Sequence, residues 1–238
     1  MKISSNNKYN GWVSDFNLKV NKTGAIVKLD LHTERDLFLL FVIASAWSRS
    51  AKWENAVFFT TYLKQENNWE IKTWLDNNFI KAEIEKREET TKNILSKVSG
   101  IKPREKVSFR SDLFHSVQVL SQNWNSIKQK LNCAKGNNDW NSFIAYIGSI
   151  VGLGIKGKRM RIKIPLILRE LKCQRIYNIS GEYCCVVDKR VRDTYKKYIE
   201  KKLPHDFLSA SKEIWNDFGE LYDIPAFAYE DFRKLGLL

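Results

Sequence analysis

The feature that most constrains the fold is a pair of apolar stripes that share helical spacing and flank a glycine-containing turn. The stripes comprise Trp140, Phe143, Ile144, Ile147 and Val151, then Ile164, Ile167, Leu168 and Leu171. Steps of three and four residues place such side chains on one face of an α-helix. Gly152-Leu153-Gly154 interrupts the pattern, so the sequence predicts a helix, a tight turn and a second helix. Pro165 either kinks that second helix or lies in its first turn, near Ile164, where proline is well accommodated.

A strongly basic segment, 156–163, lies between the two stripes, with five basic residues in eight positions and no acidic one. Glycine has no Cβ and can take positive φ, so a glycine turn lets backbone N–H groups approach a phosphate. Nearby basic side chains would hold a nucleic-acid strand without reading its sequence. The chain has 40 Lys and Arg against 27 Asp and Glu, a formal net charge of +13, which favours a polyanionic partner. An ordinary αα-turn with a solvated basic face is the alternative.

The remaining periodicity is mainly helical. Apolar alternation over 13–31, around Asn21-Lys22-Thr23-Gly24, predicts an N-terminal β-hairpin. Thr33-Glu34-Arg35-Asp36 resembles a capping box and predicts the start of a helix over 37–49. Further helices are predicted over 53–63, 69–79, 80–98, 109–121, 123–132, 189–201 and 208–221, with a polar turn at 134–138 and a short helix near the C-terminus. The chain is therefore predicted to be mainly α.

The cysteine and histidine spacing argues against a metal centre. The four cysteines form no CxxC pair and the three histidines are scattered, so we expect reduced, mostly buried thiols and no metal. The polar start of the chain lacks the apolar core of a secretory signal. The longest apolar run, 37–47, is shorter than the roughly 18 residues that a membrane span needs. We therefore expect a soluble, cytoplasmic monomer with no membrane partner.

One combination of residues resembles a known family. Gly152-Leu153-Gly154-Ile155-Lys156, with Val187-Asp188 placing an aspartate 32 residues after the lysine, is similar to the Gly-x-Gly-x-Lys hairpin and downstream Val-Asp of the helix-hairpin-helix DNA glycosylases. The long gap most resembles the archaeal 8-oxoguanine DNA glycosylase branch. Additional sparse landmarks between about 40 and 230 are Trp53, Lys163, Ile214-Trp215 and Ile224-Pro225.

The resemblance implies two helical lobes around a cleft, formed by 34–172 and by 1–33 with 173–238. It implies a bifunctional DNA glycosylase and abasic-site lyase that needs no cofactor. Lys156 would attack the deoxyribose C1′, expel the base and form a Schiff base, and Asp188 would help to activate the amine and stabilise positive charge on the sugar. Lysine is a nucleophile only when neutral, and neighbouring cations lower its pKa.

The resemblance also implies that the partner is double-stranded DNA containing a modified base, and it assigns binding roles to several residues. Trp53, Lys163 and Glu230 would contact the extruded base. Residues of the hairpin would contact the DNA backbone; these are Gly152, Gly154, Lys158 and Arg159. The sequence departs from the family where an Asp and, four residues later, a Trp surround the oxidised purine, because Glu230 and Lys234 stand there. The substrate is therefore 8-oxoguanine by resemblance, or another damaged or hypermodified base.

The sequence leaves the nucleophile and the roles of two further residues open. Aligning Lys163 and Asp188 with the family favours Lys156 as nucleophile, whereas aligning the residues before the hairpin favours Lys158. Asp188 could simply cap a helix, the commoner use of such an aspartate, and Trp53 could pack in a core. A helix-hairpin-helix protein that binds DNA without chemistry is the competing hypothesis. Action on DNA would make the protein nucleoid-associated.

Overall fold

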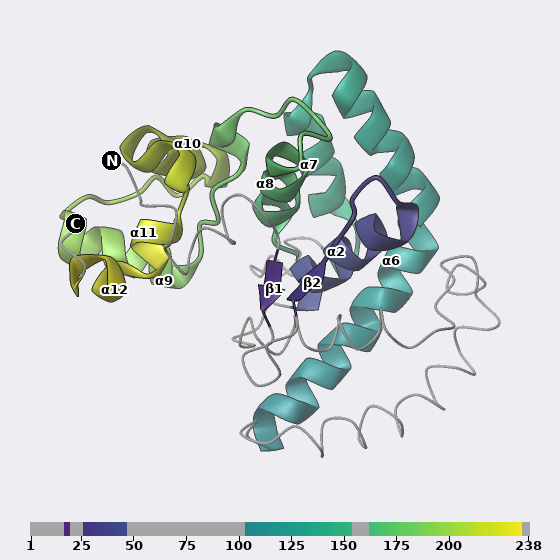
Figure 1. Ribbon diagram of the computed structural model, residues 1–238, viewed down its shortest axis with the longest axis horizontal. Helices are drawn as coiled ribbons and strands as arrows, with labels where there is room; N and C mark the ends of the chain where they lie inside the picture. Colours follow the sequence, from purple (N-terminus) through teal and green to yellow (C-terminus); the bar gives the residue numbers. More distant parts are fainter. Residues whose placement is uncertain (1–16, 20–25, 47–102, 154–161, 235–238) are drawn as a thin grey trace. The chain divides into compact units, whose positions relative to one another are not determined.

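The computed structural model describes residues 17–19, 26–46, 103–153 and 162–234, and the chain is mainly helical, as predicted (Figure 1). It divides into two compact units. The central unit is Leu18–Lys163, and the C-terminal unit combines Met1–Asn17 with Ile164–Leu238. The helices predicted over 53–63, 69–79 and 80–98 lie outside the described residues.

The central unit begins with two short strands where the alternation predicts a hairpin. β1 (Asn17–Lys19) pairs with β2 (Ile26–Lys28) in a two-stranded sheet; residues 20–25 lie outside the described residues. In the described part of this unit three helices follow: α2 (Glu34–Ala46), α6 (Pro103–Asn137) and α7 (Trp140–Ser149). Helix α2 packs on α6, and α6 packs on α7.

Helix α2 starts three residues earlier than predicted, because Thr33 caps it. The Thr33 hydroxyl accepts a hydrogen bond from the Asp36 backbone N–H (3.3 Å). The buried Asp36 carboxylate accepts one from the backbone N–H of Asp30 (2.8 Å). The hydrogen bond to the Thr33 hydroxyl is the usual one of a capping box. The Asp36 carboxylate instead binds the backbone N–H of Asp30 and so anchors the segment before the helix.

The core of the central unit is centred on Trp124 of α6, which is fully buried. Its ring packs edge to face against Phe38 and Phe41 of α2, with centroid distances of 5.0 and 5.4 Å. Its indole N–H donates a hydrogen bond to Glu34 (2.9 Å). Aromatic pairs in this geometry add attraction to the hydrophobic effect, so this cluster ties α2 to α6.

Helix α6 corrects the prediction of two helices over 109–121 and 123–132, because it is continuous through both (Figure 1). Leu120, Trp124, Ile127 and Leu131 are buried at steps of three and four residues, so the apolar face continues across the expected break. The Asn123 side chain there donates a hydrogen bond to the carbonyl of Val119 (2.8 Å). The predicted turn at 134–138 is also wrong over most of its length, since α6 ends only at Asn137.

Glu34 provides a pH-dependent link between α2 and α6. Its carboxylate accepts hydrogen bonds from Lys128 Nζ (2.5 Å) and from Trp124. The Lys128 hydrogen bond in particular holds the pKa of Glu34 below its ordinary value of 4.5, and burial opposes the effect. A lowered folded-state pKa means that the stabilisation is present above pH 4.5 and is lost as the pH falls through the folded-state pKa.

We expect Glu34→Gln to lower stability at neutral pH by up to about 1 kcal/mol, since the carboxylate is partly exposed. The difference between the two proteins should shrink as the pH falls below 4.5, the ordinary pKa of the carboxyl group. Urea unfolding of both proteins at about pH 7, 5 and 3.5 measures this. A difference independent of pH would show that the Glu34 charge contributes nothing.

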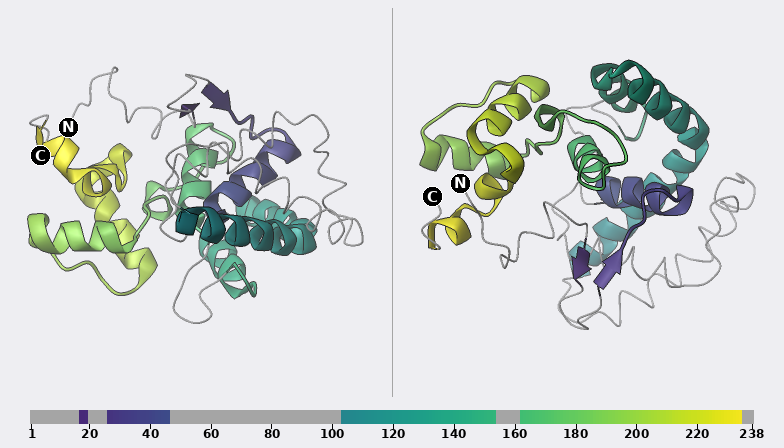
Figure 2. Two further views of the ribbon diagram at one scale, coloured as in Figure 1. Left: turned by 90° about the horizontal axis from the view of Figure 1, so that it is seen from below. Right: turned by 45° about the horizontal axis from the view of Figure 1, so that its top comes forward.

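The C-terminal unit is built from short helical elements (Figure 2). They are α8 (Ile164–Cys173), η1 (Gly181–Tyr183), α9 (Lys189–Thr194), η2 (Tyr195–Ile199), α10 (Phe207–Phe218), η3 (Gly219–Leu221), α11 (Ile224–Phe227) and α12 (Tyr229–Lys234). Helix α8 begins at Ile164 with Pro165 in its first turn, which decides between the two alternatives for that proline. Gly181 lies against Trp215 of α10, and a Cβ there would come within 2.2 Å of the indole.

The division between the units differs from the boundaries expected at 33/34 and 172/173, and the contacts explain why. Helix α8 belongs to the C-terminal unit because Arg169 forms an ion pair with Asp223 (3.0 Å) and Lys172 one with Glu220 (3.1 Å). The segment before α2 belongs to the central unit, where the Asp30 backbone N–H donates a hydrogen bond to the Asp36 carboxylate of α2. No described helix has the length and apolar character needed to cross a bilayer.

Candidate functional site

The turn after α7 is the best-defined part of the predicted hairpin. Helix α7 is capped by Asp139, which accepts a hydrogen bond from the Ser142 N–H (3.0 Å), and its predicted apolar face is buried. The Leu153 N–H then donates to the Ile150 carbonyl (3.1 Å). Gly152 within this turn has φ of 99°, a conformation that glycine adopts readily and other residues rarely.

The basic loop that follows is closed at its base by backbone hydrogen bonds. The Ile162 N–H donates to the Leu153 carbonyl (3.2 Å), and the Lys163 N–H donates to the Ala44 carbonyl of α2 (3.0 Å). The residues that flank segment 154–161 are therefore joined to each other and to α2. The loop itself lies outside the described residues.

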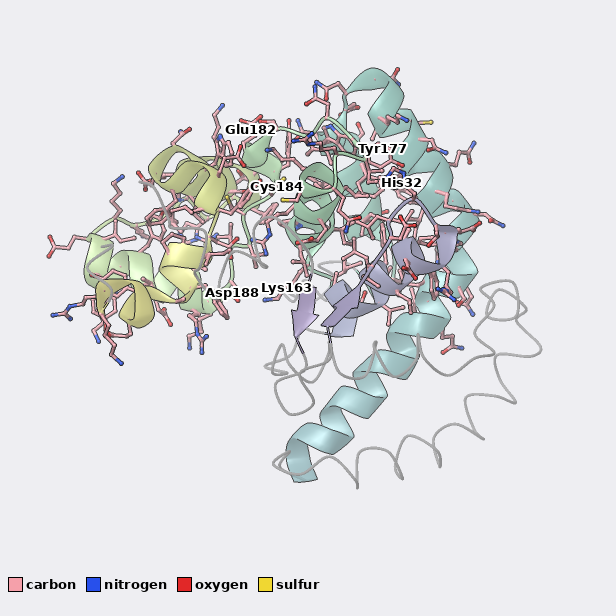
Figure 3. All side chains as sticks on the ribbon, in the orientation of Figure 1. His32, Lys163, Tyr177, Glu182, Cys184 and Asp188 are labelled. Atoms are coloured by element: carbon pink, nitrogen blue, oxygen red, sulfur yellow. The ribbon has the colours of Figure 1, made fainter. Side chains whose placement is uncertain are left out.

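Five predicted site residues lie outside the described residues, four of them in segment 154–161 and one in 47–102. These are Lys156, Lys158, Arg159, Gly154 and Trp53. Lys163, at the end of the loop, is half-buried. Gly152 and Lys163 belong to the central unit, and Asp188 and Glu230 to the C-terminal unit; Figure 3 labels Lys163 and Asp188.

Val151 corrects its assignment to the buried stripe of α7. Its side chain is 69% exposed and is the one large apolar side chain that is exposed among the described residues. It lies outside the helix, which ends at Ser149, so helical periodicity could not place it. An exposed valine next to Gly152 makes the turn a mixed apolar and polar surface, and only its position beside a glycine could have suggested this from the sequence.

Asp188 caps helix α9. The residue is half-buried, and its Oδ1 accepts a hydrogen bond from the Val191 N–H (3.1 Å). This is the simple capping role considered from the sequence. Capping also fixes the carboxylate at the positive end of the first helical turn, where its charge is favoured. The cap therefore orients the group without excluding electrostatic contact with a ligand.

The segment that leads into Asp188 is held by buried polar groups that the sequence did not reveal. The Cys185 N–H donates to the Ser211 hydroxyl (3.2 Å). The Val186 N–H donates to Oδ1 of Asp223 (2.8 Å), which also accepts from Arg169 (3.0 Å). The backbone is thus fixed two residues before Asp188.

Arg169 and Asp223 form this anchor in a dry environment, with side-chain exposures of 3% and 7%. Burial by itself would lower the pKa of Arg169, but the neighbouring carboxylates of Asp223 and Glu170 outweigh it and the pKa is raised. The guanidinium therefore stays charged inside the protein. Burial raises the pKa of Asp223, and the Arg169 charge and the Val186 N–H oppose that rise, so the charged state of each group depends on the other.

Glu230, which the resemblance assigns to the base, occupies an exposed position on α12. Its carboxylate accepts a hydrogen bond from the Tyr198 hydroxyl (2.9 Å). The Tyr198 ring stacks on Tyr229 with centroids 4.2 Å apart. Lys234, four residues on, is also exposed. A base-binding role for Glu230 stays a prediction.

Three of the described cysteines, Cys173, Cys184 and Cys185, are poor nucleophiles. Cys184 and Cys185 are buried, and burial raises the pKa of both thiols. Burial also raises the pKa of Cys173 to about 11, so little thiolate forms at neutral pH. Within the described ranges, no group of three or more His, Cys, Asp or Glu side chains is arranged to hold a metal ion.

Comparisons with protein-family models, with curated proteins and with solved structures find no match to this chain. Function must therefore be inferred from the residues and contacts themselves.

Proposed function

We propose that the protein is a DNA glycosylase and abasic-site lyase that removes a modified base through Lys156. The observation that supports this most is the glycine turn with positive φ at Gly152, just before the basic segment 154–161, whose flanking residues Leu153 and Ile162 are joined by a backbone hydrogen bond. Such a turn can bring backbone and lysine side chains close to a sugar-phosphate strand. Lys156 lies four residues beyond that glycine.

The proposed chemistry needs a neutral amine and a fixed carboxylate. The Lys156 amine attacks C1′ of an extruded nucleotide, the glycosidic bond breaks, and the base leaves with the electron pair of that bond and a proton. The sugar ring opens to a Schiff base. Loss of the C2′ proton then expels the 3′ phosphate by β-elimination. The other cations of the loop favour the neutral amine by disfavouring a further positive charge.

Asp188 stabilises the positive charge that develops on the sugar and helps to activate the amine. A charge held in place before the reaction needs no reorganisation when the transition state forms. The capping hydrogen bond from Val191 provides this fixed orientation. Lys163 and Trp53 would contact the extruded base, which must leave the helical stack before it can react.

The substrate class is an oxidised or otherwise modified base, with 8-oxoguanine the first candidate by resemblance. Glu230 and Lys234 replace the Asp and Trp of the family there. An exposed lysine cannot supply the stacking surface of a tryptophan. A damaged or hypermodified base other than 8-oxoguanine is therefore the second candidate.

Borohydride trapping tests the proposal, because borohydride reduces a Schiff base to a stable covalent bond. The protein should form a covalent complex with duplexes that contain an abasic site or an accepted modified base, but not with unmodified DNA. Asp188→Asn should lower the trapping rate by about 10²–10³-fold.

A matched control separates this effect from the loss of a helix cap. Asp206 caps α10 in the same way, accepting from the Ser209 N–H (2.7 Å). Asp206→Asn should leave trapping unchanged. If the wild-type protein binds DNA but traps on no lesion, it is a DNA-binding module without chemistry.

A further inference from the structure

Helix α9 continues directly into the π-helical turn η2, giving a single helical rod over 189–199. The rod ends where the Glu200 N–H donates to the Tyr195 carbonyl, and Glu200 takes a left-handed conformation with φ of 59°. π-helical turns are rare and often occur at functional sites. The rod begins at Asp188, the carboxylate assigned to the sugar.

The rod presents a row of exposed cations, which we call the α9–η2 cation tract: Lys189, Arg190, Lys196 and Lys197. Within the described part of the chain, none of the four forms an ion pair. Other cations of the C-terminal unit do, since Lys172 pairs with Glu220, Lys201 with Asp217 and Lys212 with Glu182. Arg192, also on the rod, is turned away and donates to the backbone carbonyls of 203–205. Two carboxylates are near the tract without an ion pair to it among the described residues: Glu230 acts electrostatically on Lys197, and the exposed Asp193 lies on the rod itself. The tract therefore keeps a net positive charge.

The tract stands on a rigid support. Tyr195 is buried beneath it, and its hydroxyl donates to Asp217 (3.1 Å). The Arg190 guanidinium lies 4.7 Å from the Phe227 ring, and Lys197 Nζ lies 4.6 Å from the Tyr198 ring. Cations held over aromatic rings lose less freedom when they bind a ligand. Two of the four cations of the tract, Arg190 and Lys197, are therefore partly held in place before a ligand binds.

The chemistry of the surface favours a polyanion over a membrane. Insertion into a membrane surface needs apolar side chains beside the cations, and among the described residues only Val151, in the central unit, is a large apolar side chain that is exposed. The seven-residue step from Lys189 to Lys196 spans about 10 Å at about 1.5 Å per residue. Measured along the axis of a DNA duplex this length corresponds to about three base-pair steps of about 3.4 Å, so the two ends of the tract can contact different phosphates.

We infer that the α9–η2 cation tract binds the phosphodiester backbone of DNA, next to the nucleotide that Asp188 contacts. The inference rests on the proposed function, because that function makes DNA the partner. It adds a second backbone-binding surface, in the C-terminal unit, to the glycine turn of the central unit. Contacts of this kind position the strand and carry no sequence information.

The salt dependence of DNA binding tests the inference. The probe is a duplex with a tetrahydrofuran abasic analogue, which cannot form a Schiff base, and binding is followed by fluorescence anisotropy between about 50 and 200 mM salt. Lys196→Gln with Lys197→Gln should reduce the slope of log K against log salt by about 1.8, or about 0.9 for each phosphate that is no longer neutralised. Lys172→Gln with Lys212→Gln removes the same charge from the same unit and should change the slope far less.

The outcomes separate this inference from the enzymatic one. A smaller slope only in the tract variant supports the surface, even if wild-type protein traps on no lesion. An unchanged slope, or an equal change in both variants, overturns it, even if trapping succeeds. Binding to phosphatidylserine vesicles that the tract variant alone loses, with DNA binding unchanged, would also overturn it in favour of a membrane surface.

Discussion

Lys156→Gln is expected to abolish the borohydride-trapped complex on an abasic duplex, whereas Lys158→Gln is expected to retain it. Glutamine keeps much of the length of lysine but has no amine, so no Schiff base can form at that position. The loss should therefore be complete, while DNA binding falls only by the effect of one charge. Gel analysis of trapped complexes, with anisotropy on the same duplex, measures both quantities.

The pair of variants also decides between the two candidate nucleophiles. Each removes one positive charge from the same loop, so each serves as the charge control for the other. Trapping that survives in Lys156→Gln and disappears in Lys158→Gln would reassign the nucleophile by two residues. Trapping that survives in both would exclude this loop as the source of the amine.

The pH dependence of trapping gives an independent check on the electrostatics of the loop. The reacting amine must be neutral, so the rate should rise with pH through the pKa of that amine. Neighbouring cations disfavour another positive charge, so this pKa should lie below about 10.4, the ordinary value for lysine. A rate that keeps rising up to about pH 10 would show that the loop does not tune its lysine.

The elements that local rules describe well were predictable from the sequence. Helix α7 has a single apolar face. Helix α8 has an apolar first half, whose first turn accommodates Pro165, although it is buried on every side from Ile164 to Leu171. Helix α6 was predicted with a false break because a few polar residues were read as a boundary, although the buried face continues from Leu120 to Trp124. Steps along one face are the better guide in such a helix than local composition.

The candidate site shows the same contrast between local and distant contacts. The turn at Gly152 and the cap at Asp188 follow from residues adjacent in sequence. The anchor of Arg169 and Asp223 joins residues 54 positions apart, and no local pattern marks either of them. The ends of the units depend on such contacts, which is why the boundary near α8 could not be placed from periodicity.

Asp223→Ala is expected to destabilise the protein by about 3–5 kcal/mol, the cost of breaking a buried ion pair. The change would leave the Arg169 charge, with 3% of its side chain exposed, without the carboxylate that stabilises it. It would also remove the acceptor of the Val186 N–H. Urea unfolding followed by circular dichroism measures the loss. Glu182→Ala, which breaks a partly exposed pair with Lys212, should cost at most about 1 kcal/mol.

Two further variants show which interaction of Asp223 accounts for the destabilisation. Asp223→Asn keeps an oxygen that can accept from Val186 but loses the charge, so most of the destabilisation should remain if the buried guanidinium dominates. Arg169→Met removes the charge itself, and combining it with Asp223→Ala should cost less than the sum of the single changes. Additive effects, or an Asp223→Ala cost as small as that of Glu182→Ala, would mean that the ion pair is not what fixes the chain before Asp188.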